Sequence, residues 1–200
     1  MTSKITLAVC AVLLLSGVVM AAVGTEDTST IRVDTSAYSH SIHDGADAHS
    51  QIFECKVDIK PELGIGLEAV KVSDADGRTH IGNIYLRKPV PLKDNKTTRL
   101  EGYAGISWLS VEDVFDQESS DTGFSFGAIT DFTLRPELTL YSRLGVALLD
   151  EPLWTLDAGV RYELRPRWFL SIGYRGYNTN GSSLGGFLVG ATYRAIKDSK

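Results

Sequence analysis

The sequence is short of cysteine and has no excess of basic residues, and each shortage excludes a class of protein. It contains 2 cysteines, of which only Cys55 lies beyond the apolar N-terminal segment, and 20 lysines and arginines against 25 aspartates and glutamates. One remaining cysteine cannot form an internal disulfide. A formal net charge of −5 provides no basic surface for nucleic acid. We therefore expect neither a disulfide framework nor a nucleic-acid partner, and no motif calls for a cofactor.

Beyond residue 24 the sequence also lacks any helix-forming pattern and any linker that would divide it into domains. The preceding segment starts with Lys4, continues as an uncharged apolar run over 5–23, and ends in small residues up to Gly24. This order is typical of a signal peptide. An uncleaved membrane anchor is the alternative, because the run is nearly long enough to span a bilayer. We expect a signal peptide at 1–24 and one domain at 25–200.

What the sequence has in abundance is alternation of apolar and polar residues, the period of a β-strand. The clearest case is 153–177, where two alternating runs meet at a tight connection around Pro166, which predicts a β-hairpin with one apolar and one charged face. The same pattern predicts ten strands, at about 30–38, 53–60, 63–72, 79–88, 98–110, 124–134, 138–148, 153–164, 168–177 and 185–195. Eight strands is the alternative, because the runs at 30–38 and 79–88 are weaker.

Three tight connections repeat one motif, KPEL at 60–63, RPEL at 135–138 and RPRW at 165–168. Every second connection contains proline, and the alternate ones are polar and mostly longer. In an up-and-down barrel the two kinds of connection would lie at opposite ends. The polar loops are predicted at 39–50, 74–79, 111–122, 150–152 and 178–184.

Alternation does not decide which face meets water, because a soluble barrel has the same period as a membrane barrel. The apolar faces carry charge only at Lys71 and Lys88, which a membrane face permits but a soluble core would show too. Two further features favour the membrane. The aromatic residues of the apolar faces gather at strand ends, as in interfacial girdles. The polar face holds more glycines than the apolar face, and glycine relieves crowding inside a narrow barrel. We therefore expect an all-β fold, a transmembrane antiparallel up-and-down β-barrel with its apolar face in lipid.

The polar face would then line the lumen, where acids and bases nearly balance. A barrel of eight to ten strands is largely filled by its own side chains, so we expect these charges to form a structural network rather than a selectivity device. The predicted lumen network comprises Glu68, Glu101, Asp131, Arg143, Asp157, Arg161 and Arg175. The predicted aromatic girdle comprises Trp108, Trp154, Trp168, Tyr162 and Tyr174.

The segment LDAGVRYELRPRWFLSIGYRGY and the closing strand GGFLVGATYRAI resemble the small outer-membrane β-barrel proteins, the class of the OmpA transmembrane domain, OmpX and the YfaZ-like proteins. The resemblance covers about the last 100 residues. It implies a cell outer-membrane location, insertion by the barrel-assembly machinery, contact with outer-membrane lipid and a monomeric state. One departure is the tail RAIKDSK after Tyr193, since such proteins usually finish on an aromatic residue.

One cluster has the residue types of a metal site. His40, His43 and His49 accompany Asp44 and Asp47 in a predicted polar loop. Loop ligands without a fixed scaffold lose affinity to the entropy of ordering, so a solvated loop is the preferred interpretation and we assign no metal.

Enzymes of similar architecture give a second comparison. Outer-membrane lipid A deacylases use a His and Ser pair near the final strands, but no histidine follows His80, so Ser182 and Ser183 lack a base. Ten-stranded barrel proteases use His and Asp at the loop rim, which leaves His80 with Asp74 or Asp76 as a formal candidate. We expect no enzyme, but a barrel with a structural or surface-interaction role. A narrow solute or ion pore and a soluble periplasmic barrel binding an apolar ligand are the alternatives.

Overall fold

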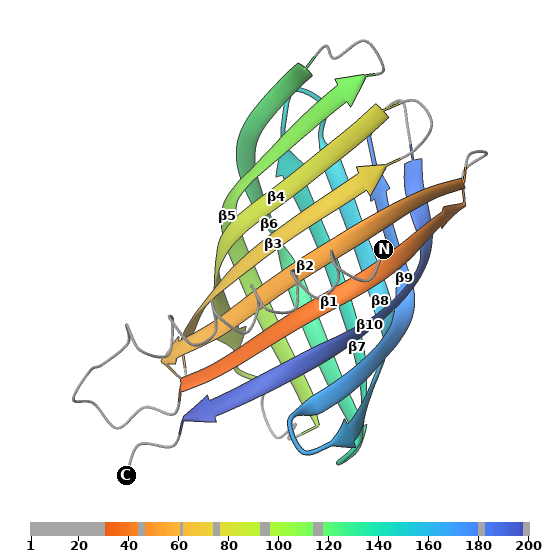
Figure 1. Cartoon of the computed structure of the whole chain (residues 1–200). Coiled ribbons are helices and arrows are strands. Elements are labelled where there is room, and N and C mark those ends of the chain that lie inside the picture. The colour runs from red at the N-terminus through yellow and green to blue at the C-terminus, as the bar shows by residue number, and fades with distance from the viewer. Residues whose placement is uncertain are drawn as a thin grey trace.

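In the computed structural model, the residues described are 31–43, 47–60, 62–73, 77–92, 97–113, 118–179 and 183–197. Over these residues ten antiparallel strands form one closed barrel, in which each strand pairs with its sequence neighbours and β1 pairs with β10 (Figure 1). The strands are β1 (Ile31–His43), β2 (Asp47–Lys60), β3 (Leu63–Ser73), β4 (Gly77–Val90), β5 (Thr98–Asp113), β6 (Glu118–Arg135), β7 (Leu138–Leu148), β8 (Leu153–Arg165), β9 (Trp168–Asn178) and β10 (Ser183–Lys197).

The predicted all-β barrel of ten strands is confirmed, and the eight-strand alternative is wrong. Both weak runs form full strands, because β1 pairs with β10 and β2, and β4 pairs with β3 and β5. Within the described ranges no helix is long and apolar enough to span a bilayer. The predicted signal peptide at 1–24 lies outside the described residues.

Four of the five predicted loops include strand residues, and the difference is largest for two of them. The predicted loop at 39–50 is mostly strand, since β1 runs to His43 and β2 begins at Asp47. The predicted loop at 111–122 is likewise strand at both ends, since β5 runs to Asp113 and β6 begins at Glu118. Strand pairing extends through both polar segments because main-chain hydrogen bonds between adjacent strands do not require apolar side chains. Polar composition alone therefore does not end a strand.

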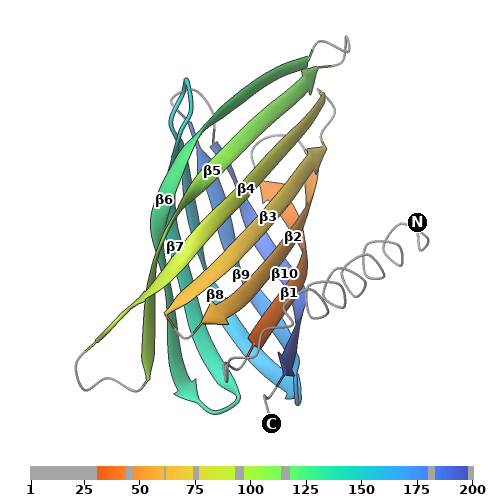
Figure 2. The ribbon, with the colours of Figure 1, turned by 90° about the vertical axis from the view of Figure 1, so that its left-hand side faces the viewer.

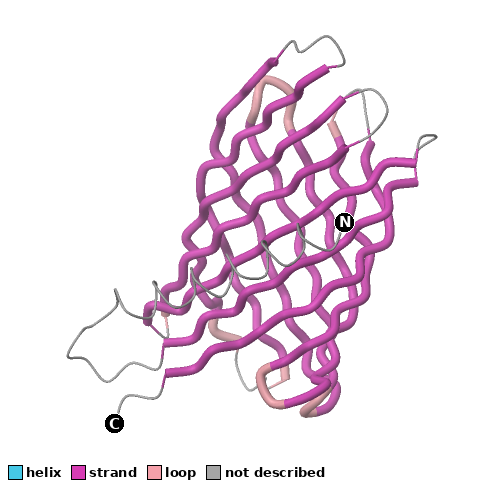
Figure 3. Tube along the Cα trace, in the orientation of Figure 1, coloured by secondary structure: helices cyan, strands magenta, loops and turns pink. Residues whose placement is uncertain are grey.

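The two kinds of connection lie at opposite ends of the barrel, as predicted. The start of β1 and the end of β10 lie at one end, together with the proline-bearing connections after β2, β4, β6 and β8 (Figure 2). We call this the turn end and the opposite one the loop end. The strands are strongly tilted and close into a continuous wall (Figure 3).

The three repeated turn motifs share one backbone irregularity. The register shifts once before each turn, between Asp58 and Lys60, between Thr133 and Arg135, and between Glu163 and Arg165. The skipped residue is aliphatic in each case and precedes a basic residue and proline. A bulge of this kind adds one residue to one strand and increases local twist. The sequence repeat thus corresponds to a repeated bulge and turn.

The outer wall of the barrel is apolar and exposed. Many large hydrophobic side chains project from it, with exposed fractions of 72% for Phe124 and 73% for Phe187. Charged side chains point instead into the lumen, where Glu54, Glu68 and Arg175 are buried. Compared with a soluble protein, this barrel is therefore turned inside out.

Candidate functional site in the barrel lumen

The centre of the lumen is occupied by Arg143, which projects from β7. Its guanidinium contacts the carboxylate of Glu68 closely and lies 3.7 Å from that of Glu54. Two tyrosine rings face it, with the Arg143 Cζ atom 5.2 Å from the centroid of Tyr85 and 5.0 Å from that of Tyr103. A guanidinium gains both from paired carboxylates and from aromatic faces at such distances. Arg143 therefore anchors a buried network of residues from five strands, its own and four others.

A second arginine extends this network. Arg175 on β9 donates through Nε to Asp157 Oδ2 at 3.0 Å and through Nη2 to the same oxygen. Its Nη1 lies 3.7 Å from Glu68 Oε2 and 3.5 Å from the hydroxyl oxygen of Tyr177. Because Arg143 and Arg175 share Glu68, the charges form one connected cluster across the lumen.

A separate group of ion pairs lies nearer the turn end. Arg87 donates through Nη1 to Glu101 at 2.9 Å and through Nη2 to Asp58. Arg99 Nη2 lies 2.6 Å from Glu101 Oε1 and 3.6 Å from Asp58. Here two arginines compensate two carboxylates, so the charges are balanced locally.

The structure places all seven residues of the predicted lumen network inside the barrel, each with an oppositely charged neighbour. The remaining pair, Arg161 with Asp131, has an N–O distance of 3.7 Å. The predicted set was incomplete, because it omitted charged residues whose side chains also point into the lumen and join these ion pairs. These additional partners are Glu54, Lys56, Asp58, Arg87 and Arg99.

Glycines make room for the lumen tyrosines. A Cβ atom at Gly66 would overlap the ring of Tyr85, and one at Gly145 would overlap the hydroxyl of Tyr103. At Gly159 a Cβ atom would come 2.7 Å from the hydroxyl of Tyr141. Part of each tyrosine side chain thus occupies the space beside a glycine on another strand, which explains why glycine is frequent on the lumen face.

The loop-end part of the lumen is apolar, which sequence analysis did not foresee. The expectation of a lumen that is polar throughout is wrong. Val70 and Val72 on β3 alternate in step with Glu68, so their side chains also point inward. In the closed barrel they meet side chains from other strands and form a packed layer above the charges. This apolar layer comprises Ile52, Val70, Val72, Ile81, Ala147, Leu149, Leu153, Tyr177 and Leu188.

Little space remains between these side chains. Cavities among the charged residues near Arg143 and Arg161 measure about 10–20 Å³ each. A water molecule needs about 10–15 Å³ measured in this way. Each cavity therefore accommodates about one water, and none approaches the size of a small-molecule site.

The residues of the predicted girdle are all exposed on the outer wall. Trp108, Trp154 and Tyr174 lie toward the loop end, and Tyr162 and Trp168 lie toward the turn end. Trp168 packs on Tyr193 with ring centroids 5.0 Å apart, and Tyr174 packs edge-on against Phe187 at 6.2 Å.

The candidate metal cluster falls largely outside the described residues. The side chains of His40, His43, His49 and Asp47, and the whole of Asp44, lie outside the described parts. Over the residues that are described, no group of three histidine, cysteine or carboxylate side chains could hold a metal ion.

The catalytic candidates are described only in part. His80 on β4 alternates with the inward-facing Ile81, so its side chain points away from the lumen. Its formal partners Asp74 and Asp76, and Ser182, lie outside the described residues. Ser183 begins β10 and is exposed.

Comparison with known proteins identifies the fold. No family model and no curated protein matches the chain by sequence. Among solved structures, the outer membrane protease OmpT from Escherichia coli is 9% identical, covers 86% of this chain and 100% of its own, and gives a TM-score of 0.51. An outer membrane channel from Pseudomonas putida F1 is 9% identical, with 86% of this chain and 99% of that chain covered and a TM-score of 0.51.

The N-terminal β-barrel domain of Pseudomonas aeruginosa OprF also matches, at 8% identity over 84% of this chain and 98% of that chain, with a TM-score of 0.42. Identities this low establish likeness of fold and nothing about activity. The resemblance to outer-membrane β-barrels predicted from the sequence is confirmed at that level. On the two matches with TM-scores of 0.51, the chain has the fold of the outer-membrane β-barrel proteins.

Proposed function

We propose that this protein is an integral outer-membrane β-barrel with a side-chain-filled lumen, a structural or surface-interaction role and no enzymatic activity. The observation that carries the proposal is the apolar outer wall around a charged lumen. An exposed apolar surface on this scale is uncommon on soluble monomers, whereas a bilayer requires it. Closure of the sheet meets the second requirement, because lipid cannot satisfy backbone hydrogen bonds.

In this proposal the turn end faces the periplasm and the loop end faces outward. The girdle residues at the two ends would lie at the two membrane interfaces. Outer-membrane lipid and the barrel-assembly machinery are the expected partners. A closed barrel offers no unpaired sheet edge to a second copy, which supports a monomer.

The filled lumen supports a closed barrel over a narrow pore. The apolar layer seals the loop-end half, and the two ion-pair groups occupy the rest. A soluble barrel with an apolar ligand inside is disfavoured for the same reason, since the cavities among the charged residues are too small for a ligand.

The surface role rests on the β5–β6 hairpin, which reaches beyond its neighbours at the loop end (Figure 2). β6 pairs with β7 only from Phe124 onward, so residues 118–122 extend past the paired end of β7. Asp121 ties this extension to the next connection, because its carboxylate accepts the N–H of Asp150 at 2.5 Å. An ordered projection of this kind suits contact with an external partner.

Membrane fractionation with a heat-modifiability gel tests the membrane assignment. We expect the protein to stay in the membrane pellet after carbonate washing and to migrate differently before and after boiling. Release by carbonate or salt, with no heat-dependent band shift, would overturn the assignment.

Planar-bilayer recording tests the closed lumen. The purified barrel should insert without producing a steady conductance. A steady single-channel conductance that changes in Arg143→Ala would instead identify a pore.

A further inference from the structure

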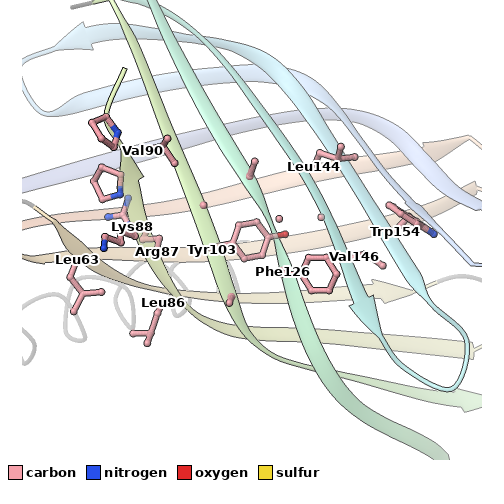
Figure 4. Close-up of a pocket in the computed structure, with 17 residues that line it drawn as sticks. Leu63, Leu86, Arg87, Lys88, Val90, Tyr103, Phe126, Leu144, Val146 and Trp154 are labelled. Atoms are coloured by element: carbon pink, nitrogen blue, oxygen red, sulfur yellow. The ribbon is translucent and has the colours of Figure 1, made fainter. Parts of the chain in front are cut away.

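The outer wall carries a groove of about 880 Å³ that crosses β4 to β8. Figure 4 shows Lys88 and Val90 at one end of it and Trp154 at the other, with Phe126 and Leu144 along its side. Its volume falls within the range of about 300–1,000 Å³ typical of ligand sites. The cavities among the lumen charges measure only about 10–20 Å³, and a hollow at the loop end beside Leu149 and Asp150 measures about 330 Å³.

The floor of the groove is built from small residues on adjacent strands. Gly102 pairs with Lys88 on β4 and with Ala128 on β6, and Ala104 lies two residues farther along β5. A Cβ atom at Gly102 would meet nothing within 4 Å. No protein atom therefore covers the floor of the groove at Gly102.

Other glycines on the outer wall are covered by aromatic rings. A Cβ atom at Gly82 would overlap the indole of Trp108, and one at Gly185 would overlap the hydroxyl of Tyr174. At these positions the protein fills the space above glycine itself. At Gly102 it does not, so the space is left for another molecule.

The groove runs from the turn end toward the loop end. Lys88 lies two residues before the end of β4 at the turn end, while Trp154 is the second residue of β8 at the loop end. The register connects these ends through neighbouring pairs: Lys88 with Gly102, Gly102 with Ala128, and Ala128 with Leu144. A track in this direction suits an extended hydrocarbon chain lying along the bilayer normal.

We propose that the groove retains one anionic glycerophospholipid from the leaflet at the turn end. Its acyl chain lies over Gly102 and Ala128, and its phosphate binds the ammonium of Lys88. Lys88 is exposed and forms no ion pair within the described part of the chain, so its charge is available at the turn-end limit of the apolar groove. A lysine at this depth extends toward the membrane interface, where phosphate groups lie. This inference rests on the proposed membrane function.

Native mass spectrometry of the barrel released from nanodiscs provides the test. The nanodiscs contain phosphatidylcholine and phosphatidylglycerol in equal amounts. The wild type should retain one phosphatidylglycerol about fivefold more often than one phosphatidylcholine. This factor corresponds to the attraction of about 1 kcal/mol between one basic residue and anionic headgroups. Lys88→Gln should abolish this headgroup preference while lipid is still retained.

Filling the groove should abolish retention itself. Gly102→Leu has open space for its side chain, and Ala104→Leu acts at the neighbouring floor position. The matched control is Ala191→Leu, an exposed position on β10 outside the groove, which should behave as the wild type.

Equal retention of both lipids by the wild type, or unchanged retention in Gly102→Leu and Ala104→Leu, would overturn the inference. A dimer that dissociates in Gly102→Leu would assign the groove to a second copy of the chain and overturn it as well. Failure of the wild type to enter nanodiscs would be a different result, because it would overturn the membrane function on which the inference rests.

Discussion

At the scale of single residues, Arg143 shows how this lumen accommodates buried charge. Its side chain is 5% exposed, and its guanidinium pairs with the buried carboxylates of Glu68 and Glu54. Removing one partner of a buried pair costs more than removing both, because an uncompensated charge remains. The contribution of each charged residue to the free energy of unfolding therefore depends on whether its partners in the lumen network are present.

Arg143→Ala should lower the free energy of unfolding by about 3 kcal/mol, the lower end for a broken buried pair. The lower end applies because Glu54 keeps Lys56 at 3.0 Å and Glu68 keeps Arg175 at 3.7 Å. Urea unfolding in phosphatidylcholine vesicles, followed by tryptophan fluorescence, measures it. The double variant Glu68→Gln/Arg143→Met removes both charges and should lose less than half as much. Equal losses would contradict the interpretation.

Glycines on the two faces of the barrel wall should differ sharply in their tolerance of a methyl group. Gly66→Ala places a Cβ atom into the ring of Tyr85 and should destabilise the barrel by about 1–3 kcal/mol, as overpacking does. Gly102→Ala meets open space and should be neutral or gain about 0.4–1 kcal/mol from reduced chain entropy. The same urea titration compares them, and similar losses in both variants would refute the packing explanation.

At the scale of elements, the strands were predictable and their ends were not. Alternation places each side chain on one face, so Glu68 and Arg143 could be assigned to the lumen without coordinates. It cannot say which strands face one another across a closed barrel. For this reason the shared role of Glu68 between Arg143 and Arg175 emerged only from the structure. The apolar layer was missed for the same reason.

The bulge before each tight turn was also beyond the sequence pattern. KPEL, RPEL and RPRW were visible as repeats, but the skipped pairing of Ile59, Leu134 and Leu164 depends on twist within the folded sheet. One turn differs from its neighbours in backbone conformation. Arg167 has a φ of 76°, in the left-handed region, which disfavours residues with a Cβ atom.

Arg167→Gly should therefore stabilise the β8–β9 turn. Relief of about 1–2 kcal/mol of left-handed strain exceeds the ~0.5–1 kcal/mol of added chain entropy. The matched control is Glu137→Gly in the β6–β7 turn, where no left-handed φ occurs, and it should lose about 0.5–1 kcal/mol. Opposite shifts of the two urea midpoints are expected. A loss of stability in both variants would count against backbone strain at Arg167.

At the scale of the whole molecule, closure of the sheet makes the apolar outer wall and the charged lumen possible. Joining β1 to β10 leaves no strand edge, so backbone polar groups are paired around the wall. The wall can then expose apolar side chains to lipid while the lumen holds the charges. The same arrangement in water would leave a large hydrophobic surface exposed, so the environment decides whether this architecture is stable.

The central claim is that the outer wall faces lipid, and site-directed spin labelling tests it most directly. Single nitroxides are placed at Leu144 and Ile172, which are 56% and 53% exposed on the outer wall, after Cys10 and Cys55 are replaced by alanine. Glu137 in a turn at the turn end serves as the control. In vesicles we predict frequent collisions with oxygen and few with a water-soluble nickel chelate at Leu144 and Ile172, and the reverse at Glu137. Frequent nickel collisions at all three sites would contradict the account.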